Sequence, residues 1–187
     1  MVKRLFIAML VVLMMASVAG AVQIGKVTVP DSMKAGDQQL LLNGAAPTTK
    51  MGMKIYGVGL YLKAKSQDSQ AILAADEPMA IKLVMIYKAL KGPQLAEAYV
   101  DIFEDMEVDT EAMKAEIEAF NAAFAGEKLT TNDVIDYVYI PGQGTNVSIK
   151  GKLKGTMKGL AFKKALFGVF IHKDAFEAKR RKALLGM

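Results

Sequence analysis

The residue types that usually carry catalysis or bind metals are scarce in this sequence of 187 residues. His172 is the single histidine, and the chain has no cysteine. A zinc site or a Ser-His-Asp triad would have to be built on that one histidine, whereas such sites need several groups placed together. The acidic residues are typical of solvated helix faces rather than of a carboxylate pair. The sequence therefore predicts no metal site, no cofactor and no catalytic residues.

Lys54 and Tyr56 form the arrangement that best predicts ligand binding. They stand two positions apart in the run 50–62, KMGMKIYGVGLYL, which is predicted as one long strand. Because alternate residues of a strand share a face, both side chains are expected on one face, with apolar side chains following them there. With Lys50 nearby, an ammonium and a phenol would hold a carboxylate in front of an apolar floor. The alternative is that Lys54 extends to solvent and the floor is ordinary core.

The same run also predicts where the strand lies in the fold. Both of its faces are largely apolar, which is typical of a central strand covered on both sides. Gly57 and Gly59 remove two neighbouring side chains from one face. Such a bare strip lets a helix, a neighbouring backbone or a ligand approach closely, and a packed helix is the expected neighbour.

The remaining elements predict an α+β domain, with an antiparallel sheet and helices gathered on one face. Asn43-Gly44 is predicted as a hairpin turn before the long strand. Further strands are expected at 22–30, 39–42, 79–87, 134–140, 145–150 and 152–157. Helices are expected at 66–75, 93–104, 160–170 and 174–185, and between a cap at Asp109 or Thr110 and a stop at Gly126.

The first 21 residues are typical of a secretory signal peptide. Lys3 and Arg4 precede an apolar run of 11 residues, and Ala19 and Ala21 supply the small residues of a cleavage site. The alternative, an uncleaved anchor, needs about 20 apolar residues, and no other stretch approaches that length, so no membrane span is expected in the mature chain. The sequence thus predicts a periplasmic or secreted protein, with one domain at 22–187.

The composition fits a globular protein that does not bind nucleic acid. Hydrophobic residues make up 52% of the chain and charged residues 23%, enough for one domain with a real core. Removal of the two basic residues in the signal peptide lowers the formal charge from +5 to +3. So small an excess of positive charge does not predict nucleic acid as a partner.

Several short motifs occur in an order that resembles the chalcone isomerase-like family in its bacterial form. Leu42-Asn43-Gly44 is followed by Thr48-Thr49-Lys50 and then by the long strand. The C-terminal half adds IPGQGT, VSIKGKLKGTMKG, FKKALFGVF and KALLG, so the resemblance covers nearly the whole mature chain. It implies a large antiparallel sheet with helices layered on one face and a smaller sheet alongside, an open-faced β-sandwich. Because some members bind fatty acids, it also implies a fatty acid or another apolar molecule as ligand.

The residues with which plant-type members isomerise chalcones are not matched. Those members use an arginine before the long strand, a threonine on it, and a tyrosine, a lysine and an asparagine after the next strand. The corresponding positions here are Thr48, Tyr56, Leu95, Ala98 and Ile102. The mature chain has two arginines, Arg180 and Arg181, both expected in the terminal helix, where neither is expected to replace the missing one. A lysine does not reproduce the planar, bidentate grip of a guanidinium.

These observations predict an exported, non-catalytic chalcone isomerase-like protein of the cell envelope. Two roles fit it: a module that interacts with other proteins, or a module that binds an apolar, fatty-acid-like molecule. The predicted ligand-binding residues are Thr48, Lys50, Lys54 and Tyr56. The alternative is a lyase or isomerase of the chalcone isomerase type with a rearranged active site. An open space between the long strand and the helix layer would favour binding, and a filled one would favour interaction.

Overall fold

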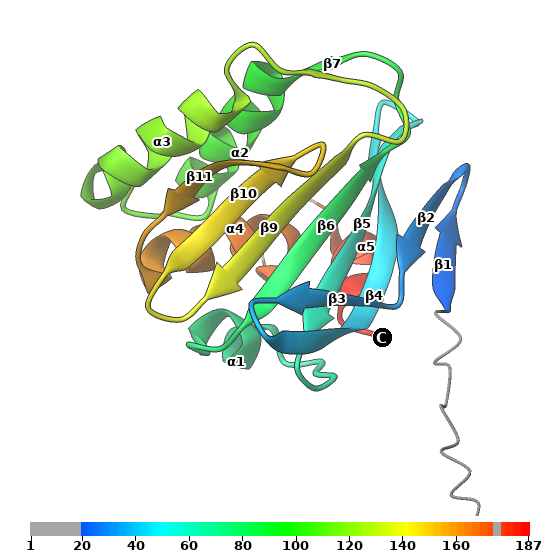
Figure 1. The fold of residues 1–187 in the computed structure, drawn as a ribbon, viewed down its shortest axis with the longest axis horizontal. Helices are drawn as coiled ribbons and strands as arrows, with labels where there is room; N and C mark the ends of the chain where they lie inside the picture. The colour runs from blue at the N-terminus through cyan, green and yellow to red at the C-terminus, as the bar shows by residue number, and fades with distance from the viewer. Residues whose placement is uncertain (1–19, 174–176) are drawn as a thin grey trace, which may run out of the picture.

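The structure is a computed structural model, and it describes residues 20–173 and 177–187. A seven-stranded sheet forms the centre of the fold (Figure 1), in the order β11-β10-β9-β6-β5-β4-β3 with every neighbouring pair antiparallel. Its strands are β3 (Ser32–Ala35), β4 (Gln38–Lys50), β5 (Met53–Leu62), β6 (Met79–Met85), β9 (Val134–Ile140), β10 (Gly144–Ile149) and β11 (Lys152–Met157). The predicted central strand is confirmed, because β5 pairs with β4 on one side and β6 on the other.

Helices cover one face of the sheet and form the main core; in the view of Figure 1 some lie behind the sheet and others beyond its β11 edge. They are α1 (Ser69–Ala74), α2 (Gly92–Asp105), the 3-10 helix η1 (Glu111–Met113), α3 (Lys114–Phe124), α4 (Leu160–Ile171) and α5 (Ala178–Leu184). Asp68 caps α1 by accepting hydrogen bonds from the backbone N–H groups of Gln70 and Ala71. A small sheet of β7 (Leu90–Lys91) and β8 (Lys128–Leu129) joins the ends of the helical layer.

A hairpin, not a helix, covers the glycine strip on the other face of the sheet. The predicted strand at 22–30 turns back at Gly25, so it forms β1 (Ala21–Ile24) and β2 (Val27–Pro30). A Cβ at Gly59 would lie 2.6 Å from Val29 Cγ1, and one at Gly57 would lie 3.3 Å from Ile24 Cδ1. Close approach was therefore predicted correctly, but the neighbour was not, because two short strands fill the narrow strip that a helix was expected to fill.

The turn expected at Asn43-Gly44 is also wrong, since β4 runs through both residues. The β4–β5 pairing shifts its register between Leu42 and Gly44, which leaves Asn43 as an extra residue in a bulge. The real turn is at Met51-Gly52, where both residues have positive φ, 50° and 78°. The run 50–62 is thus the end of one strand, a tight turn and a second strand.

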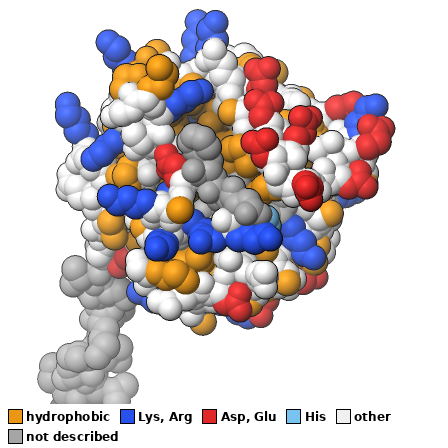
Figure 2. Space-filling view, turned by 180° about the vertical axis from the view of Figure 1, so that it is seen from behind, with side chains coloured by type: hydrophobic (Ala, Val, Ile, Leu, Met, Phe, Trp, Pro, Cys, Tyr) orange, Lys and Arg blue, Asp and Glu red, His pale blue; other side chains and the backbone are white. Residues whose placement is uncertain are grey.

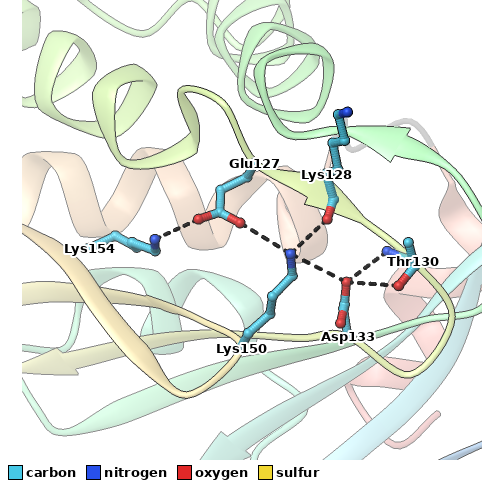
Figure 3. A network of polar contacts seen from close by, with 6 residues as sticks. All are labelled: Glu127, Lys128, Thr130, Asp133, Lys150 and Lys154. Atoms are coloured by element: carbon cyan, nitrogen blue, oxygen red, sulfur yellow. Dashed lines mark hydrogen bonds and ion pairs between the residues drawn. The ribbon is translucent and has the colours of Figure 1, made fainter.

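A polar network ties the helical layer to the far end of the sheet (Figure 3). Lys150 stands at the turn between β10 and β11 and donates to Lys128 O at 2.7 Å and to Glu127 Oε2 at 3.2 Å. Lys154 forms a second ion pair with Glu127. The hydrogen bond from Lys154 is the main reason that the pKa of the Glu127 carboxyl lies below its usual value. These contacts join the segment after α3 to the turn between β10 and β11.

Two predictions fall wholly or partly outside the described residues. They are the signal peptide at 1–21, of which only Gly20 and Ala21 are described, and the start of the terminal helix at 174–176. Within residues 20–173 and 177–187, no helix is long and apolar enough to cross a membrane.

Candidate ligand-binding site

A cavity of about 650 Å³ lies where the ends of β4 and β5 meet the helical layer. We call it the first cavity. Figure 2 shows the face of the molecule opposite to that of Figure 1, where acidic side chains gather towards one edge and Lys and Arg side chains form a band across the face. The cavity is lined by Thr48, Thr49, Lys50, Ile55, Tyr56, Leu90, Gln94, Leu95, Glu97, Ala98, Tyr99, Asp101, Ile102, Val169, Glu177 and Arg180. Its volume is within the range of small-molecule sites.

Two tyrosines meet in the lining of this cavity. The hydroxyl of Tyr56, from β5, lies 3.3 Å from that of Tyr99, from α2, and both side chains are buried. The ring of Tyr99 also packs edge-on against Phe170. Burial holds the pKa of Tyr99 well above its ordinary value, so this phenol stays neutral at physiological pH and keeps a proton to donate.

Lys54 and Tyr56 do not share a face of the strand, in contrast to the expectation. The β4–β5 register shifts between Thr48 and Thr49, so that Thr48 pairs with Tyr56, Thr49 pairs with Lys54, and Ile55 is the extra residue of a bulge. A bulge breaks the alternation of side chains that the prediction assumed. Tyr56 consequently lines the first cavity, whereas Lys54 lines a second cavity of about 660 Å³.

Of the four predicted ligand-binding residues, the structure brings three together. Thr48, Lys50 and Tyr56 all line the first cavity. Lys54 lies apart from these three residues. Its ammonium is 3.8 Å from the point where a Cβ would stand on Gly25, in the β1–β2 turn.

Arg180 reaches this site from α5, in contrast to the expectation that neither arginine would replace the missing one. Its side chain is buried, with 5% of the residue exposed, and Nη1 donates a hydrogen bond to Thr48 Oγ1 at 3.1 Å. Nη2 donates to Val169 O at 2.9 Å, and the guanidinium lies over the ring of Phe170 at 5.5 Å. Position 48, where the resemblance implies an arginine, carries a threonine. Arg180, which is 132 positions further along the chain, brings a guanidinium to this position.

Glu177 stands beside Arg180 and faces the same strand. Its Oε1 accepts a hydrogen bond from the backbone N–H of Thr49 at 3.1 Å, and its Oε2 lies 3.6 Å from Arg180 Nη1. Its side chain is only 19% exposed. A carboxylate is therefore held between a backbone N–H of β4 and the guanidinium.

The bulge residue Asn43 and its neighbour Gly44 fix the helix that carries Arg180. Asn43 Nδ2 donates to Leu184 O at 2.8 Å and to Ser66 O at 2.9 Å, while its Oδ1 accepts from Ser66 N at 2.8 Å. Gly44 allows the backbone of α5 to lie directly against β4, because a Cβ there would be 2.1 Å from Ala183 O. The Leu42-Asn43-Gly44 motif could have signalled this close approach, although it was interpreted as a turn.

The apolar walls and the hydrogen-bond donors of the first cavity are suited to an amphiphile with a negative charge. Apolar side chains from β5, α2 and α4 form the walls, and a guanidinium and two phenols provide donors at one end. Arginine binds a carboxylate with two parallel hydrogen bonds, and phenols add single ones. Among the described residues, no group of three or more His, Cys, Asp and Glu side chains is placed to hold a metal ion.

Comparison with known proteins establishes the family. The family model described as chalcone isomerase-like matches residues 21–186, so the chain belongs to the chalcone isomerase-like family. Among solved structures it is similar to the fatty-acid binding protein of Arabidopsis thaliana, with 20% sequence identity and a TM-score of 0.71 over 89% of this chain and 96% of that chain. A search of the curated proteins finds no match. The predicted fold, a large antiparallel sheet with helices on one face and smaller sheets, is confirmed.

Proposed function

We propose that this protein is an exported, non-catalytic member of its family that binds an apolar, fatty-acid-like molecule in the first cavity. The observation that carries the proposal is the cavity itself, which has mostly apolar walls and a buried cation at one end. The fold it shares with a plant protein described as fatty-acid binding adds support. An interaction module with a filled cleft fits less well, because about 650 Å³ remain between β5 and the helices.

The walls of the cavity also support a binding role over a catalytic one. The three positions on α2 at which the resemblance expects a tyrosine, a lysine and an asparagine carry Leu95, Ala98 and Ile102, and all three line the cavity. The surface that would stabilise charge in a reaction is therefore apolar. Losing even one preorganised donor typically costs about 10²- to 10³-fold in rate.

The isomerase alternative retains one observation in its favour, the arginine that α5 delivers to Thr48. It is tested by adding a chalcone to the purified domain. The binding role predicts that cyclisation stays at its background rate. Saturable acceleration would instead favour a rearranged active site.

Export remains a proposal that rests on the segment 1–21. The basic start, the apolar run and the small residues at 19–21 support cleavage after Ala21 and a periplasmic or secreted mature domain. N-terminal sequencing of the protein from the envelope fraction should then read from Val22. A product that keeps Met1 would contradict export by cleavage.

Filling the cavity should weaken ligand binding without harming the fold. Ala98 lies half-buried on α2 and lines the first cavity, so phenylalanine at this position would occupy space that the ligand's chain needs. For Ala98→Phe we expect the affinity for dodecanoate, measured by isothermal titration calorimetry, to fall on the order of 10-fold or more.

The matched control is Ala119→Phe, which adds the same side chain to an exposed position of α3 away from the cavity. It should leave the affinity unchanged. Equal affinities for the wild type and Ala98→Phe would show that dodecanoate binds elsewhere.

A further inference from the structure

Arg180 is a buried cation whose hydrogen bonding is incomplete. A guanidinium has five N–H donors, and the partners recorded for them among the described residues are Thr48 Oγ1 and Val169 O. Its Nε is buried and has no hydrogen-bond partner. A buried charge is costly unless it is paired and hydrogen-bonded, so this site favours an anion that can use the free donors.

Glu177 satisfies the need of the Arg180 guanidinium for an anion only in part. The 3.6 Å between its Oε2 and Arg180 Nη1 is longer than a charge-assisted hydrogen bond, which measures about 2.7–2.9 Å. Its other oxygen is held by the N–H of Thr49. Glu177 therefore neutralises Arg180 without forming a close hydrogen bond to it.

The position of this pair is suited to an amphiphile. Thr49, Glu177 and Arg180 line both the first and the second cavity, so they stand where the two meet. From this point the apolar side chains of Ile55, Leu95 and Val169 continue into the first cavity. A head group bound here would leave its chain among apolar walls.

We propose that Arg180 and the backbone N–H of Thr49 hold the carboxylate of the ligand, and that Glu177 occupies the same place in competition with it. The ligand class is a monocarboxylate with an unbranched apolar chain. This inference rests on the proposed function and adds the residue that selects acids over neutral amphiphiles. The incoming carboxylate takes the Thr49 N–H and the free donors of Arg180, while the carboxylate of Glu177 turns to solvent.

The competition gives Arg180 and Glu177 opposite effects, which a purely structural ion pair would not. Arg180→Gln should weaken binding of decanoate about 10- to 100-fold, the range for a lost hydrogen bond to a charged group. Glu177→Gln removes the competing charge but keeps an oxygen for Thr49, and it should tighten binding of decanoate by about 3- to 10-fold. Neither substitution should change the affinity for decanol, which has the same chain without the charge.

Isothermal titration of the mature domain with decanoate and with decanol tests these expectations. Lys182→Gln is the control, since it removes a positive charge from an exposed position of the same helix. If Arg180→Gln weakens both ligands equally, or if Glu177→Gln weakens decanoate or leaves it unchanged, the inference is overturned while the binding function stands. If the wild type binds neither ligand, the proposed function fails, and this inference with it. Should Arg180→Gln not fold, Glu177→Gln decides alone.

Discussion

Replacing Gly44 by alanine is expected to lower the free energy of unfolding by about 3 kcal/mol, at the upper end of the cost of overpacking. The new Cβ would lie 2.1 Å from Ala183 O and 2.6 Å from Leu184 O. Both contacts are with backbone atoms of the α5 segment, which cannot turn aside as a side chain can. The helix must therefore move away from β4, and Arg180 must move with it.

Chemical denaturation followed by circular dichroism measures the first effect, and calorimetry with decanoate measures the second. Gly155→Ala is the matched control, because it also adds a methyl group to a strand and meets only the flexible end of Met157. Gly155→Ala should lower the free energy of unfolding much less than Gly44→Ala does. If Gly44→Ala keeps both the stability and the affinity of the wild type, the close docking of α5 on β4 is wrong.

Lys163→Met is expected to destabilise the protein by about 2–4 kcal/mol, because it leaves several buried carbonyl groups without a donor. Lys163 is fully buried, and its ammonium donates to the carbonyl oxygens of Ile72 at 2.9 Å, Leu73 at 3.0 Å and Ala75 at 2.7 Å. Ile72 and Leu73 lie in the last turn of α1 and Ala75 is the residue that follows it, so these carbonyls have no partner within that helix. Lys163 thus caps the C-terminal end of α1 and ties it to α4.

The control for this substitution is Lys164→Met, at the exposed neighbouring position, which should change the stability by less than about 0.5 kcal/mol. Equal stabilities of Lys163→Met and the wild type in urea denaturation would show that the three carbonyls are satisfied in another way.

The contribution of Lys163 should also depend on pH. Burial, with the charge of Lys164 as a smaller cause, lowers its pKa from 10.5 to about 8 in the folded protein. Between these two values the unfolded chain binds more protons than the folded one, so the stability contribution of this residue rises with pH. The difference in stability between the wild type and Lys163→Met should therefore be larger at pH 9.5 than at pH 7.5. A constant or shrinking difference would contradict the lowered pKa.

Local patterns in the sequence were sufficient for the strands and helices of the core. The apolar character of both faces of the run 50–62 placed β5 at the centre of the sheet, where it pairs with β4 and β6. The boundaries of β9 and β11 match the predicted ranges. These signals work because burial of a face demands apolar side chains at regular spacing, whatever the rest of the chain does.

Turns and bulges could not be placed in the same way. Asn43-Gly44 has the composition of a tight turn. The hydrogen bonds that the Asn43 side chain forms with α5 and with the segment before α1 nevertheless keep the strand extended. Met51 adopts a positive φ that a methionine rarely adopts, so the turn at Met51-Gly52 carried only the glycine as a signal. Tertiary contacts decided the course of the chain at Asn43-Gly44.

The candidate site was only half predictable for the same reason. Thr48, Lys50 and Tyr56 were found because they are near one another in the sequence and on one strand pair. Arg180 comes from the far end of the chain, and only the docking of α5 on Gly44 brings it to Thr48. A count of two arginines in the mature chain could have marked it as a candidate, but nothing local to Arg180 distinguishes it from Arg181.

A crystal structure of the mature domain with 12-bromododecanoate tests the central claim most directly, because the bromine atom marks the end of the chain by its anomalous signal. We expect the carboxylate within hydrogen-bonding distance of Arg180 and the Thr49 N–H, with Glu177 displaced. The bromine is expected between β5 and α2, beside Ile55 and Leu95. A bromine signal on the outer surface, or no bound ligand at millimolar concentration, would contradict a binding site in the first cavity.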